Sequence, residues 1–438
     1  MRVLAVTHAY PQRSSRAHGV FIHRLNLGLR ELGHEVHVLQ LAEWCPPWPL
    51  AAVDSSWRRS HAVRDEMLDE LDGIQVHHPL TITPRPSRFF SGDQWEREVR
   101  TLARYCLRRP RLAQADVVIG HFMVPDGYHA LGLARALGLP SAAMAWGDDL
   151  HAWPASRVVW RQRLRVVLSG VDIPIACSRR MANDGNVWLE EPRRDWEVVY
   201  GGVDLELFRL ADSRDAKRRD LSAGVPAAQS AKLLLMLSQP IRAKGYVEML
   251  DAWVQVRDEA REWRLLMAGG GAGDLDVERE IADRGLGNSA HWLGPQPPER
   301  IPELLQACDA FVLPSHNEGL SLSMLEAMAT GLPVIATDVG GHAEVITSPA
   351  EGWLIAPRDT AALVRALREM TAAPIVRLNE MGLAARRAAA RIGSPLDNAG
   401  RLAAALQRGS PSKTHGPVLE KMASRVAPGD IRHADIAR

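Results

Sequence analysis

Lysine is scarce in this chain of 438 residues. Of its 53 lysines and arginines, only five are lysines, and none of them precedes residue 217. The five are Lys217, Lys232, Lys244, Lys413 and Lys421. Lys244 is the one that falls at a junction between an expected strand, a loop and a helix. Because nearly all basic residues of this chain are arginines, a lysine at this position is a candidate for a specific role. The alternative is that the lysine occurs there by chance.

Cysteine is also rare, and its spacing excludes some classes of protein. The four cysteines are Cys45, Cys106, Cys177 and Cys308, and none forms a Cys-x-x-Cys pair. Their number and separation fit a reducing cytosol and argue against structural zinc. A net charge of +1 gives no reason to expect a nucleic acid as partner.

Long apolar runs are missing too. No stretch approaches the roughly 20 apolar residues of a membrane-spanning helix. Residues 1–7 form an expected strand, without an apolar signal segment of secretory length. We therefore expect a cytoplasmic protein that is soluble or contacts a membrane only peripherally.

What the chain does contain is a regular alternation of apolar strands and amphipathic helices. Its length and its 46% content of hydrophobic residues allow two domains with substantial cores. The main expected strands are 3–6, 36–39, 116–119, 141–145 and 171–176 in the first half, and 233–237, 264–268, 290–293, 310–313, 334–337 and 352–355 in the second. This alternation predicts an α/β protein with parallel sheets covered by helices.

Glu318 and Glu326 form the most informative pair of residues. Glu318 follows the apolar run 310–313 and precedes Gly319, and Glu326 lies in the helix-like stretch that comes next. Ligands of open parallel sheets bind at the carboxyl ends of the strands. The amides from Gly319 to Leu322 would form an anion site at the start of the helix. Such amides flanked by two carboxylates suit a ligand with both phosphate and hydroxyl groups, such as a nucleotide sugar.

The segment 314–329, with its two glutamates and the glycine after the first, resembles the signature of glycosyltransferase family 4. These are retaining sugar transferases of the GT-B fold. Residues 307–315 and 331–341 resemble the family's strands on either side of the signature. Residues 266–271 and 291–294 resemble its glycine loop and its nucleotide-side strand. The resemblance covers most of residues 2–365. It implies two facing Rossmann-like domains with parallel sheets and a deep interdomain cleft.

The resemblance also gives an expected domain plan. A first, acceptor-binding domain would cover residues 1–207, and a second, nucleotide-sugar-binding domain would cover residues 208–392. A C-terminal helix at 393–408 would return to the first domain. The remaining residues, 409–438, have little periodicity and are expected to be disordered.

The family's donor site maps onto the second domain. Glu318 would face the sugar ring near the transferred carbon, and Glu326 would bind the ribose hydroxyls. The other expected donor contacts are Gly319, Leu320, Ser321, Leu322, Gly269, Gly270, Trp292 and Gln239. The plainer alternatives are a helix N-terminal carboxylate for Glu318 and a surface residue for Glu326.

The phosphate site departs from the family pattern at one position. The family binds the diphosphate with an arginine and a lysine, because negative charge builds up on the leaving phosphate. Lys244 matches the lysine, whereas Gln239 stands at the arginine position. Arg242 is the candidate replacement, and the alternative is that Arg242 is a solvated loop residue.

Gly19, His121, Asp148 and Asp149 are the candidates for acceptor or cleft contacts in the first domain. The family has a glycine at the position of Gly19, whose amide approaches the donor phosphate or the acceptor. A helix-entry turn is the alternative role. Trp146 replaces a common family histidine, so the role of that histidine does not transfer. His121 and the two aspartates could each instead be structural residues.

These assignments predict a retaining, metal-independent glycosyltransferase. It would move a sugar from a nucleotide-diphosphate sugar to a hydroxyl of a glycan, lipid-linked or small-molecule acceptor by front-face attack. No metal and no cofactor beyond the co-substrate are expected. Residues 9–21 resemble bacterial members that build surface polysaccharide. The alternatives are a nucleotide-sugar epimerase or hydrolase of the same fold, or a non-catalytic binding protein.

A nicotinamide-dependent oxidoreductase is a poorer match. That class needs Gly-x-Gly-x-x-Gly after the first strand and an acidic residue at the end of the second. Here residues 7–11 read Thr-His-Ala-Tyr-Pro, and the second strand ends at Leu39-Gln40.

One further stretch suggests a membrane contact. Arg157, Arg161 and Arg165 repeat every four residues, and Trp160, Leu164 and Val167 form a stripe beside them. This pattern predicts either a helix that lies on an anionic membrane or a core-facing helix with a solvated arginine edge.

Overall fold

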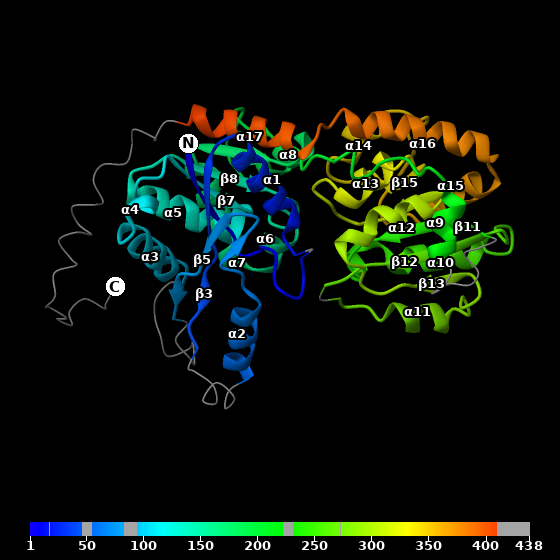
Figure 1. Ribbon diagram of the computed structural model, residues 1–438, viewed down its shortest axis with the longest axis horizontal. Coiled ribbons are helices and arrows are strands. Elements are labelled where there is room, and N and C mark those ends of the chain that lie inside the picture. Colours follow the sequence, from blue (N-terminus) through cyan, green and yellow to red (C-terminus); the bar gives the residue numbers. More distant parts are fainter. Residues whose placement is uncertain (17, 46–54, 83–93, 222–230, 272, 410–438) are drawn as a thin grey trace, which may run out of the picture.

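The computed structural model describes residues 1–438 except 17, 46–54, 83–93, 222–230, 272 and 410–438. They form two α/β units side by side, the N-terminal unit on the left of Figure 1 and the C-terminal unit on the right. All of the tail expected to be disordered, apart from Gly409, lies outside the described residues.

The N-terminal unit is built on an eight-stranded sheet. Its strand order is β10-β9-β8-β7-β1-β2-β5-β4, and all neighbours are parallel except β4 and β5. The strands are β1 (Arg2–Val6), β2 (Glu35–Leu39), β4 (Glu70–Leu71), β5 (Ile74–His77), β7 (Val117–His121), β8 (Ser141–Ala145), β9 (Ile173–Ala176) and β10 (Glu197–Val198). A separate two-stranded pair joins β3 (Ala42–Glu43) to β6 (Leu80–Thr81).

The C-terminal unit holds a six-stranded sheet in which all strands are parallel. Its order is β13-β12-β11-β14-β15-β16. The strands are β11 (Lys232–Leu237), β12 (Trp263–Ala268), β13 (Ala290–Trp292), β14 (Ala310–Leu313), β15 (Val334–Thr337) and β16 (Trp353–Ile355).

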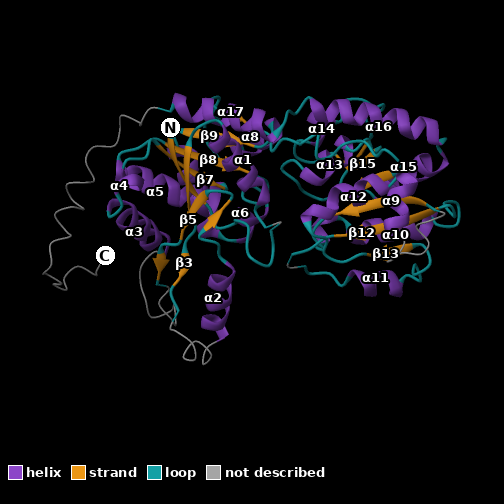
Figure 2. Ribbon diagram, viewed as in Figure 1, coloured by secondary structure: helices purple, strands orange, loops and turns teal. Residues whose placement is uncertain are grey.

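Helices cover both faces of each sheet (Figure 2). Those of the first unit are α1 (Val20–Glu31), α2 (Ser55–Glu66), α3 (Gln94–Leu107), α4 (Pro110–Ala113), α5 (Tyr128–Leu137), α6 (Ala152–Ser156), α7 (Val158–Gly170) and α8 (Arg179–Asn186). The later ones are α9 (Arg214–Leu221), α10 (Tyr246–Val256), α11 (Val277–Asp283), α12 (Ile301–Ala307), α13 (Leu322–Ala329), α14 (His342–Val345), α15 (Thr360–Ala372), α16 (Ile375–Ala390) and α17 (Pro395–Arg408).

Strand β11 shows why the apolar runs of this sequence are central strands. Leu233 and Leu235 pack into the core on one face of the sheet, and Leu234 and Met236 pack into the core on the other face. All four side chains are fully buried. A strand covered on both faces needs apolar residues at every position, because successive side chains point to opposite faces.

The chain crosses between the two units twice. Val199 belongs to the core of the first unit, whereas Val203 and Phe208 belong to a core of the second, so the first crossing falls slightly before residue 207. After α16 the chain returns, and α17 packs against α1 at the top of Figure 1. A methyl group added at Gly28 of α1 would lie 2.6 Å from Cβ of Ala399, so a glycine permits this close crossing.

Candidate active site in the interdomain cleft

A cleft of about 410 Å³ lies between the two units. It brings together ten of the predicted donor-site residues, which are Gln239, Lys244, Gly269, Gly270, Glu318, Gly319, Leu320, Ser321, Leu322 and Glu326. The first unit contributes Val20, Phe21, Arg24 and Trp146 to the opposite wall. The cleft thus lies at the carboxyl ends of the strands, where ligands of open parallel sheets bind.

Glu318 forms an ion pair at the floor of the cleft. Its Oε1 atom lies 2.8 Å from Nζ of Lys244 and also accepts a hydrogen bond of 2.8 Å from Oγ of Ser315. Burial alone would raise the pKa of Glu318, but Lys244, His342 and the hydrogen bonds together hold this pKa below its usual value. The side chain is 12% exposed. Glu318 is therefore favoured in its ionised form at the floor of the cleft.

The start of helix α13 supplies backbone amides beside Glu318. Ser321 caps the helix, and its Oγ accepts a hydrogen bond from the amide of Met324 at 3.3 Å. The first amides of a helix have no partner within it, so they favour an anion in front of them. A methyl group at Gly319 would lie 1.8 Å from the carbonyl oxygen of Trp146, so only glycine lets the first unit approach so closely.

Glu326 forms an ion pair across the cleft. Its Oε1 atom lies 3.0 Å from Nη1 of Arg24, which is a residue of helix α1. Burial raises the pKa of Glu326, and Arg24 acts in the opposite direction. The carboxylate that the resemblance assigns to the ribose hydroxyls is therefore already paired with Arg24 in this structure.

Lys244 lies in the cleft, whereas the side chain of its neighbour Arg242 lies in solvent. A tight turn, Arg242–Lys244, ends at Gly245 with φ of 77°, where a methyl group would lie 2.0 Å from the carbonyl oxygen of Pro314. This contact fixes Lys244 in the cleft. The Arg242 side chain is 61% exposed, lies 4.0 Å from Glu280 and does not line the cleft. In this structure Arg242 is therefore a solvated loop residue, which was the alternative to a role in binding phosphate.

The glycine loop lies where it was expected, but Trp292 does not. A methyl group at Gly269 would lie 1.7 Å from the carbonyl oxygen of Ser238, so a glycine allows the ends of β11 and β12 to come together at the cleft. Trp292 packs edge-on against Tyr246, with 6.2 Å between ring centroids. It lines a separate hollow of about 320 Å³ beside α11. Trp292 is the last residue of β13, the edge strand of the sheet, which explains its distance from the cleft.

An Asp-x-Asp sequence, Asp274-Leu275-Asp276, follows the glycine loop, and the expectation of no metal did not take it into account. Asp274 Oδ1 accepts a hydrogen bond of 2.9 Å from the amide of Arg242. Asp276 caps α11 through the amide of Arg279 at 3.1 Å. Within the described part of the chain, no group of three or more His, Cys, Asp or Glu side chains could hold a metal ion.

Three first-domain candidates are structural residues here. His121 is fully buried, and burial lowers its pKa to about 3. Asp149 is also fully buried and accepts hydrogen bonds from the amides of Met123, Trp146 and Gly147 at 2.7–3.1 Å. Burial raises its pKa to about 6. Gly19 has φ of 64°, and a methyl group there would lie 2.6 Å from the carbonyl oxygen of Ala9. These contacts give all three residues a role in holding the cleft wall in shape, and a contact with the acceptor stays a prediction.

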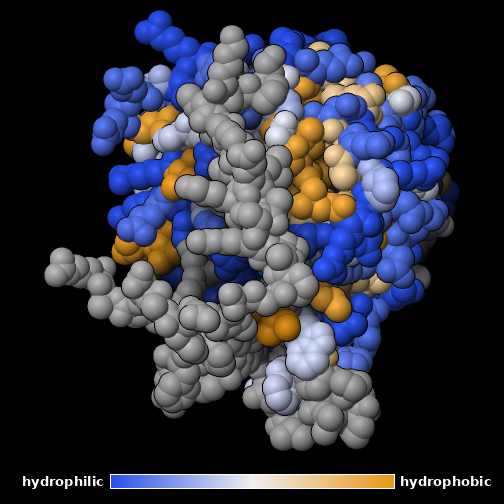
Figure 3. Space-filling view, turned by 90° about the vertical axis from the view of Figure 1, so that its left-hand side faces the viewer, coloured by the Kyte–Doolittle hydropathy of each residue, from blue (hydrophilic) through white to orange (hydrophobic). Residues whose placement is uncertain are grey.

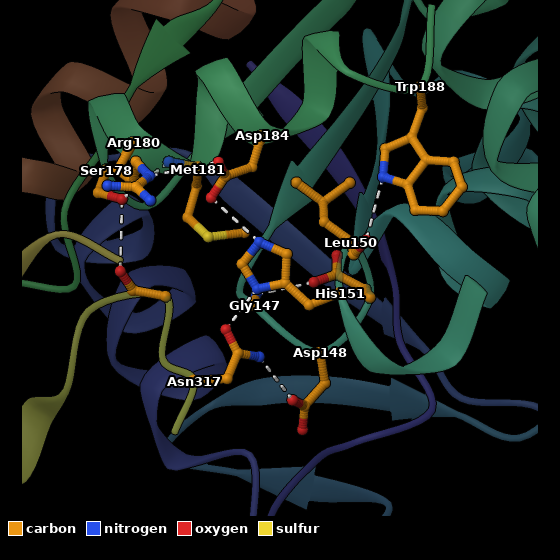
Figure 4. Close-up of polar contacts among 12 residues, drawn as sticks. Gly147, Asp148, Leu150, His151, Ser178, Arg180, Met181, Asp184, Trp188 and Asn317 are labelled. Carbon is orange, nitrogen blue, oxygen red and sulfur yellow. Dashed lines mark hydrogen bonds and ion pairs between the residues drawn. The ribbon is translucent and has the colours of Figure 1, made fainter. Parts of the chain in front are cut away.

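Asp148 belongs to a polar network that joins the two units (Figure 4). Its Oδ1 accepts a hydrogen bond of 3.2 Å from Nδ2 of Asn317, the neighbour of Glu318. This bond turns Oδ1 of Asn317 toward His151 Nδ1, with which it is hydrogen-bonded. Nε2 of His151 lies 3.0 Å from Asp184. Since both ring nitrogens face acceptors, the protonated ring is favoured, and the pKa of His151 is raised by Asp184 and Asn317 despite burial.

Glu344 makes a second set of polar contacts between the two units. Glu344 accepts hydrogen bonds from the amides of Arg179 and Arg180 at 3.2 and 2.9 Å and from the hydroxyl of Tyr200 at 2.9 Å. Glu344, which follows the glycine pair Gly340–Gly341 of the second unit, thus joins the two units.

Arg24 was not among the predicted site residues. Its sequence signal was weak, because one arginine in a helix of a chain rich in arginine has no distinguishing feature. The available clue was its position one helical turn after Val20, which follows Gly19. Only the approach of α13 from the other unit makes Arg24 a residue of the site.

Comparison with known proteins agrees with this geometry. The family model described as Glycosyltransferase Family 4 matches residues 18–207, and the one described as Glycosyl transferases group 1 matches residues 217–388. A Bacillus subtilis protein described as a teichuronic acid biosynthesis glycosyltransferase, TuaC, is 25% identical over 380 residues, which is 84% of this chain and 88% of that protein. D-inositol 3-phosphate glycosyltransferase of Nocardia farcinica is 31% identical over 250 residues, 56% of this chain and 53% of its own length.

Solved structures share the fold at low sequence identity. Sucrose-phosphate synthase of Thermosynechococcus elongatus superposes with a TM-score of 0.72 at 18% identity and covers 93% of this chain and 99% of its own. The Anabaena protein HepE in complex with UDP gives a TM-score of 0.68 at 15% identity, over 93% of this chain and 100% of its own. The two family matches and the facing Rossmann-like units together show that this chain is a GT-B glycosyltransferase and belongs to family 4.

Proposed function

We propose that this enzyme transfers a sugar with retention of configuration from a nucleotide-diphosphate sugar to an acceptor hydroxyl, without a metal ion. The observation that carries the proposal is the ion pair of Glu318 with Lys244 in front of the α13 amides. The ammonium and the amides would neutralise the leaving phosphate. Glu318 would lie beside the carbon that becomes cationic. The HepE structures, solved with UDP and with UDP-glucose, support a donor of this class.

The expected acceptor is a hydroxyl of a glycan, lipid-linked or small molecule, and the name of the TuaC relative favours a polysaccharide. No second carboxylate lines the cleft near Glu318 except Glu326, which pairs with Arg24, within the part of the chain that the structure describes. This arrangement favours front-face attack, with the leaving phosphate accepting the acceptor's proton.

The test is a thermal-shift screen with UDP, GDP, ADP and their sugars, followed by product analysis with and without acceptor. A ligand at a hundred times its dissociation constant adds about 2.7 kcal/mol to the free energy of unfolding. Transfer with retention in the presence of EDTA is the expected result. An inverted product, or loss of activity on chelation, would contradict the mechanism. Turnover without acceptor would indicate a hydrolase or epimerase, and binding without turnover a non-catalytic protein.

We also propose cytoplasmic localisation and peripheral contact with an anionic membrane, but at a different helix from the one the sequence suggested. In α7 the apolar stripe faces the domain. Trp160 packs edge-on against Trp95 and Trp153, with centroids 5.3 and 5.7 Å apart, and Leu164 is buried. Of the two alternatives for this stretch, α7 therefore matches the helix whose apolar face packs on the domain core and whose arginines lie at its edge. None of the described helices is both long and apolar enough to span a bilayer.

Helix α3 is the better candidate for that contact. Arg97, Arg100 and Arg104 follow one another at three- and four-residue spacings, so they share one face of α3, and Arg108 comes directly after the helix. They line a hollow of about 960 Å³ together with the exposed Leu80 and Ile82, and no acidic residue lines it among the described residues. Figure 3 faces this end of the molecule, where small orange apolar patches lie among blue hydrophilic side chains. Arginines beside exposed apolar groups suit anionic lipid.

Vesicle co-sedimentation tests this contact. Phosphatidylglycerol vesicles should bind the protein in a salt-sensitive way, and phosphatidylcholine vesicles should not. Changing Arg100, Arg104 and Arg108 to Gln should abolish binding. Changing Arg157 and Arg165 of α7 to Gln is the matched control and should leave binding intact. Equal binding to both lipids would contradict the proposal.

A further inference from the structure

The cleft has a shortage of positive charge for a diphosphate ligand. Among the described residues that line it, two carry a positive charge, Arg24 and Lys244. Each is paired with a carboxylate, Lys244 with Glu318 at 2.8 Å and Arg24 with Glu326 at 3.0 Å. The cleft is therefore close to neutral, whereas a nucleoside diphosphate carries at least two negative charges.

Other nearby groups do not make up the shortage. Gln239 lines the cleft but carries no charge. The guanidinium of Arg242 points to solvent beside Glu280. A second cation for the diphosphate must come from another element, and the first unit supplies one on helix α1.

We propose that Arg24 is the second phosphate-binding cation of this enzyme, held on Glu326 until the ribose hydroxyls of the nucleotide displace it. The inference rests on the proposed function and adds a substrate-contacting residue to it. Glu326 lies four residues after Leu322, the first residue of α13. That separation is about 6 Å along the helix axis, so the guanidinium needs to move by only about one turn to reach an anion at the helix start.

The chemistry of arginine suits this exchange. Its planar guanidinium can bridge two phosphate oxygens, and it stays charged in a partly buried site. The Arg24 side chain is 26% exposed, so it has room to change partners. Nucleotide binding would thus replace one pair, Arg24 with Glu326, by two interactions, ribose with Glu326 and phosphate with Arg24. Because Arg24 comes from the first unit, the same contact would hold the two units together around the donor.

The rival interpretation is that Arg24 is only a latch that keeps the two units closed. The two roles predict different results for ligands with and without phosphate. A latch affects both ligands in the same direction. A phosphate-binding Arg24 that also occupies Glu326 affects them in opposite directions.

The experiment compares the binding of a nucleoside and its diphosphate to the wild type, Arg24→Gln and Arg24→Lys by calorimetry. The base is the one among uridine, guanosine and adenosine whose diphosphate binds the wild type most tightly. In Arg24→Gln we expect diphosphate affinity to fall roughly tenfold to a hundredfold, the range for a lost charged hydrogen bond. Nucleoside affinity should rise, since Glu326 is freed. Arg24→Lys should retain part of the diphosphate affinity.

Two further variants sharpen the test. Adding Gln239→Arg to Arg24→Gln should restore diphosphate binding, because it returns a cation to the usual family position. Arg368→Gln is the matched control, since Arg368 forms an arginine–glutamate pair with Glu259 at 3.0 Å on the surface. It should leave both affinities unchanged.

Several outcomes overturn the inference. Unchanged diphosphate affinity in Arg24→Gln would do so, and so would an equal loss for nucleoside and diphosphate, which identifies a latch. If Arg24→Gln does not fold, Arg24→Lys decides the matter, and wild-type affinity with a compact ammonium would count against a bridging guanidinium. A wild type that binds no nucleoside diphosphate would overturn the proposed function as well, so the two failures are distinguishable.

Discussion

The ammonium of Lys244 lies 2.8 Å from the carboxylate of Glu318, although the two residues are 74 positions apart in the sequence. One follows strand β11 and the other follows strand β14, and these strands are neighbours in the parallel sheet. Each residue favours the charged form of the other. Burial alone would lower the pKa of Lys244, but Glu318 and Asp148 raise it. The pair places one positive and one negative charge where phosphate and sugar are expected.

The first prediction concerns the charge of Glu318. Glu318→Gln removes a carboxylate next to a carbon that becomes cationic, so kcat should fall by roughly a hundredfold or more while KM for the donor changes little. Steady-state kinetics with the identified donor measure both constants. Equal and small effects on kcat and KM would show that Glu318 only caps the helix and pairs with Lys244.

A second prediction separates the two basic residues of one turn. Arg242 is exposed and outside the cleft, so Arg242→Ala should change kcat/KM by less than about threefold, as is usual for exposed charges. Lys244→Ala should lower kcat/KM by roughly a hundredfold or more, because the leaving phosphate loses its nearest cation. A large loss in Arg242→Ala that Gln239→Arg restores would instead show that Arg242 turns into the cleft when nucleotide binds.

A third prediction concerns pH. The pKa of His151 is raised above 6.5, so its contribution to stability is fully present below pH 6.5 and is lost as pH rises through the folded-state pKa. One ring nitrogen faces Asp184, which also accepts a hydrogen bond of 3.4 Å from Arg180. The other faces Asn317, which is itself hydrogen-bonded to Asp148. His151→Gln should therefore lower the free energy of unfolding by about 1–3 kcal/mol at pH 6 and by less at pH 9.

Denaturant unfolding of the wild type and His151→Gln at the two pH values tests this expectation. Asn317→Ala removes only the hydrogen bond that the second unit makes to His151. It should lower the free energy of unfolding by less than His151→Gln does, with the same dependence on pH. A difference between wild type and His151→Gln that does not vary with pH would contradict a protonated ring.

The last prediction concerns Gly19 at the entry to α1. Gly19 and Gly33 both have positive φ, 64° and 84°, so an alanine at either position is strained by about 1–2 kcal/mol. At Gly33 nothing lies within 4 Å of the added methyl group, whereas at Gly19 it meets Ala9 at 2.6 Å. Gly19→Ala should therefore lower the free energy of unfolding by a further ~1–3 kcal/mol. Equal losses in the two variants would show that the Ala9 loop yields without strain.

The sequence by itself determined the two-sheet α/β architecture and most of the second-unit residues expected to line the cleft. β14 and the stretch Leu233–Leu237 of β11 are apolar at every position because both faces of the sheet are covered, and this pattern is local. The same holds for Glu318, Gly319 and Ser321, where strand end, turn and helix start follow one another within a few residues. Short edge strands such as β4 and β10, two residues each, gave no such signal and were not predicted.

Only the tertiary structure decided which side chains face the cleft. Arg242 and Lys244 are two residues apart, and the contact of Gly245 with Pro314 turns one inward and leaves the other in solvent. His121 ends β7 and Asp149 comes shortly after β8, but packing from neighbouring elements encloses both side chains. Arg24 became a site residue because α13 of the other unit approaches it. Such placements depend on contacts between segments that are distant in the sequence, up to 302 residues for Arg24 and Glu326, and local sequence patterns carry no information about them.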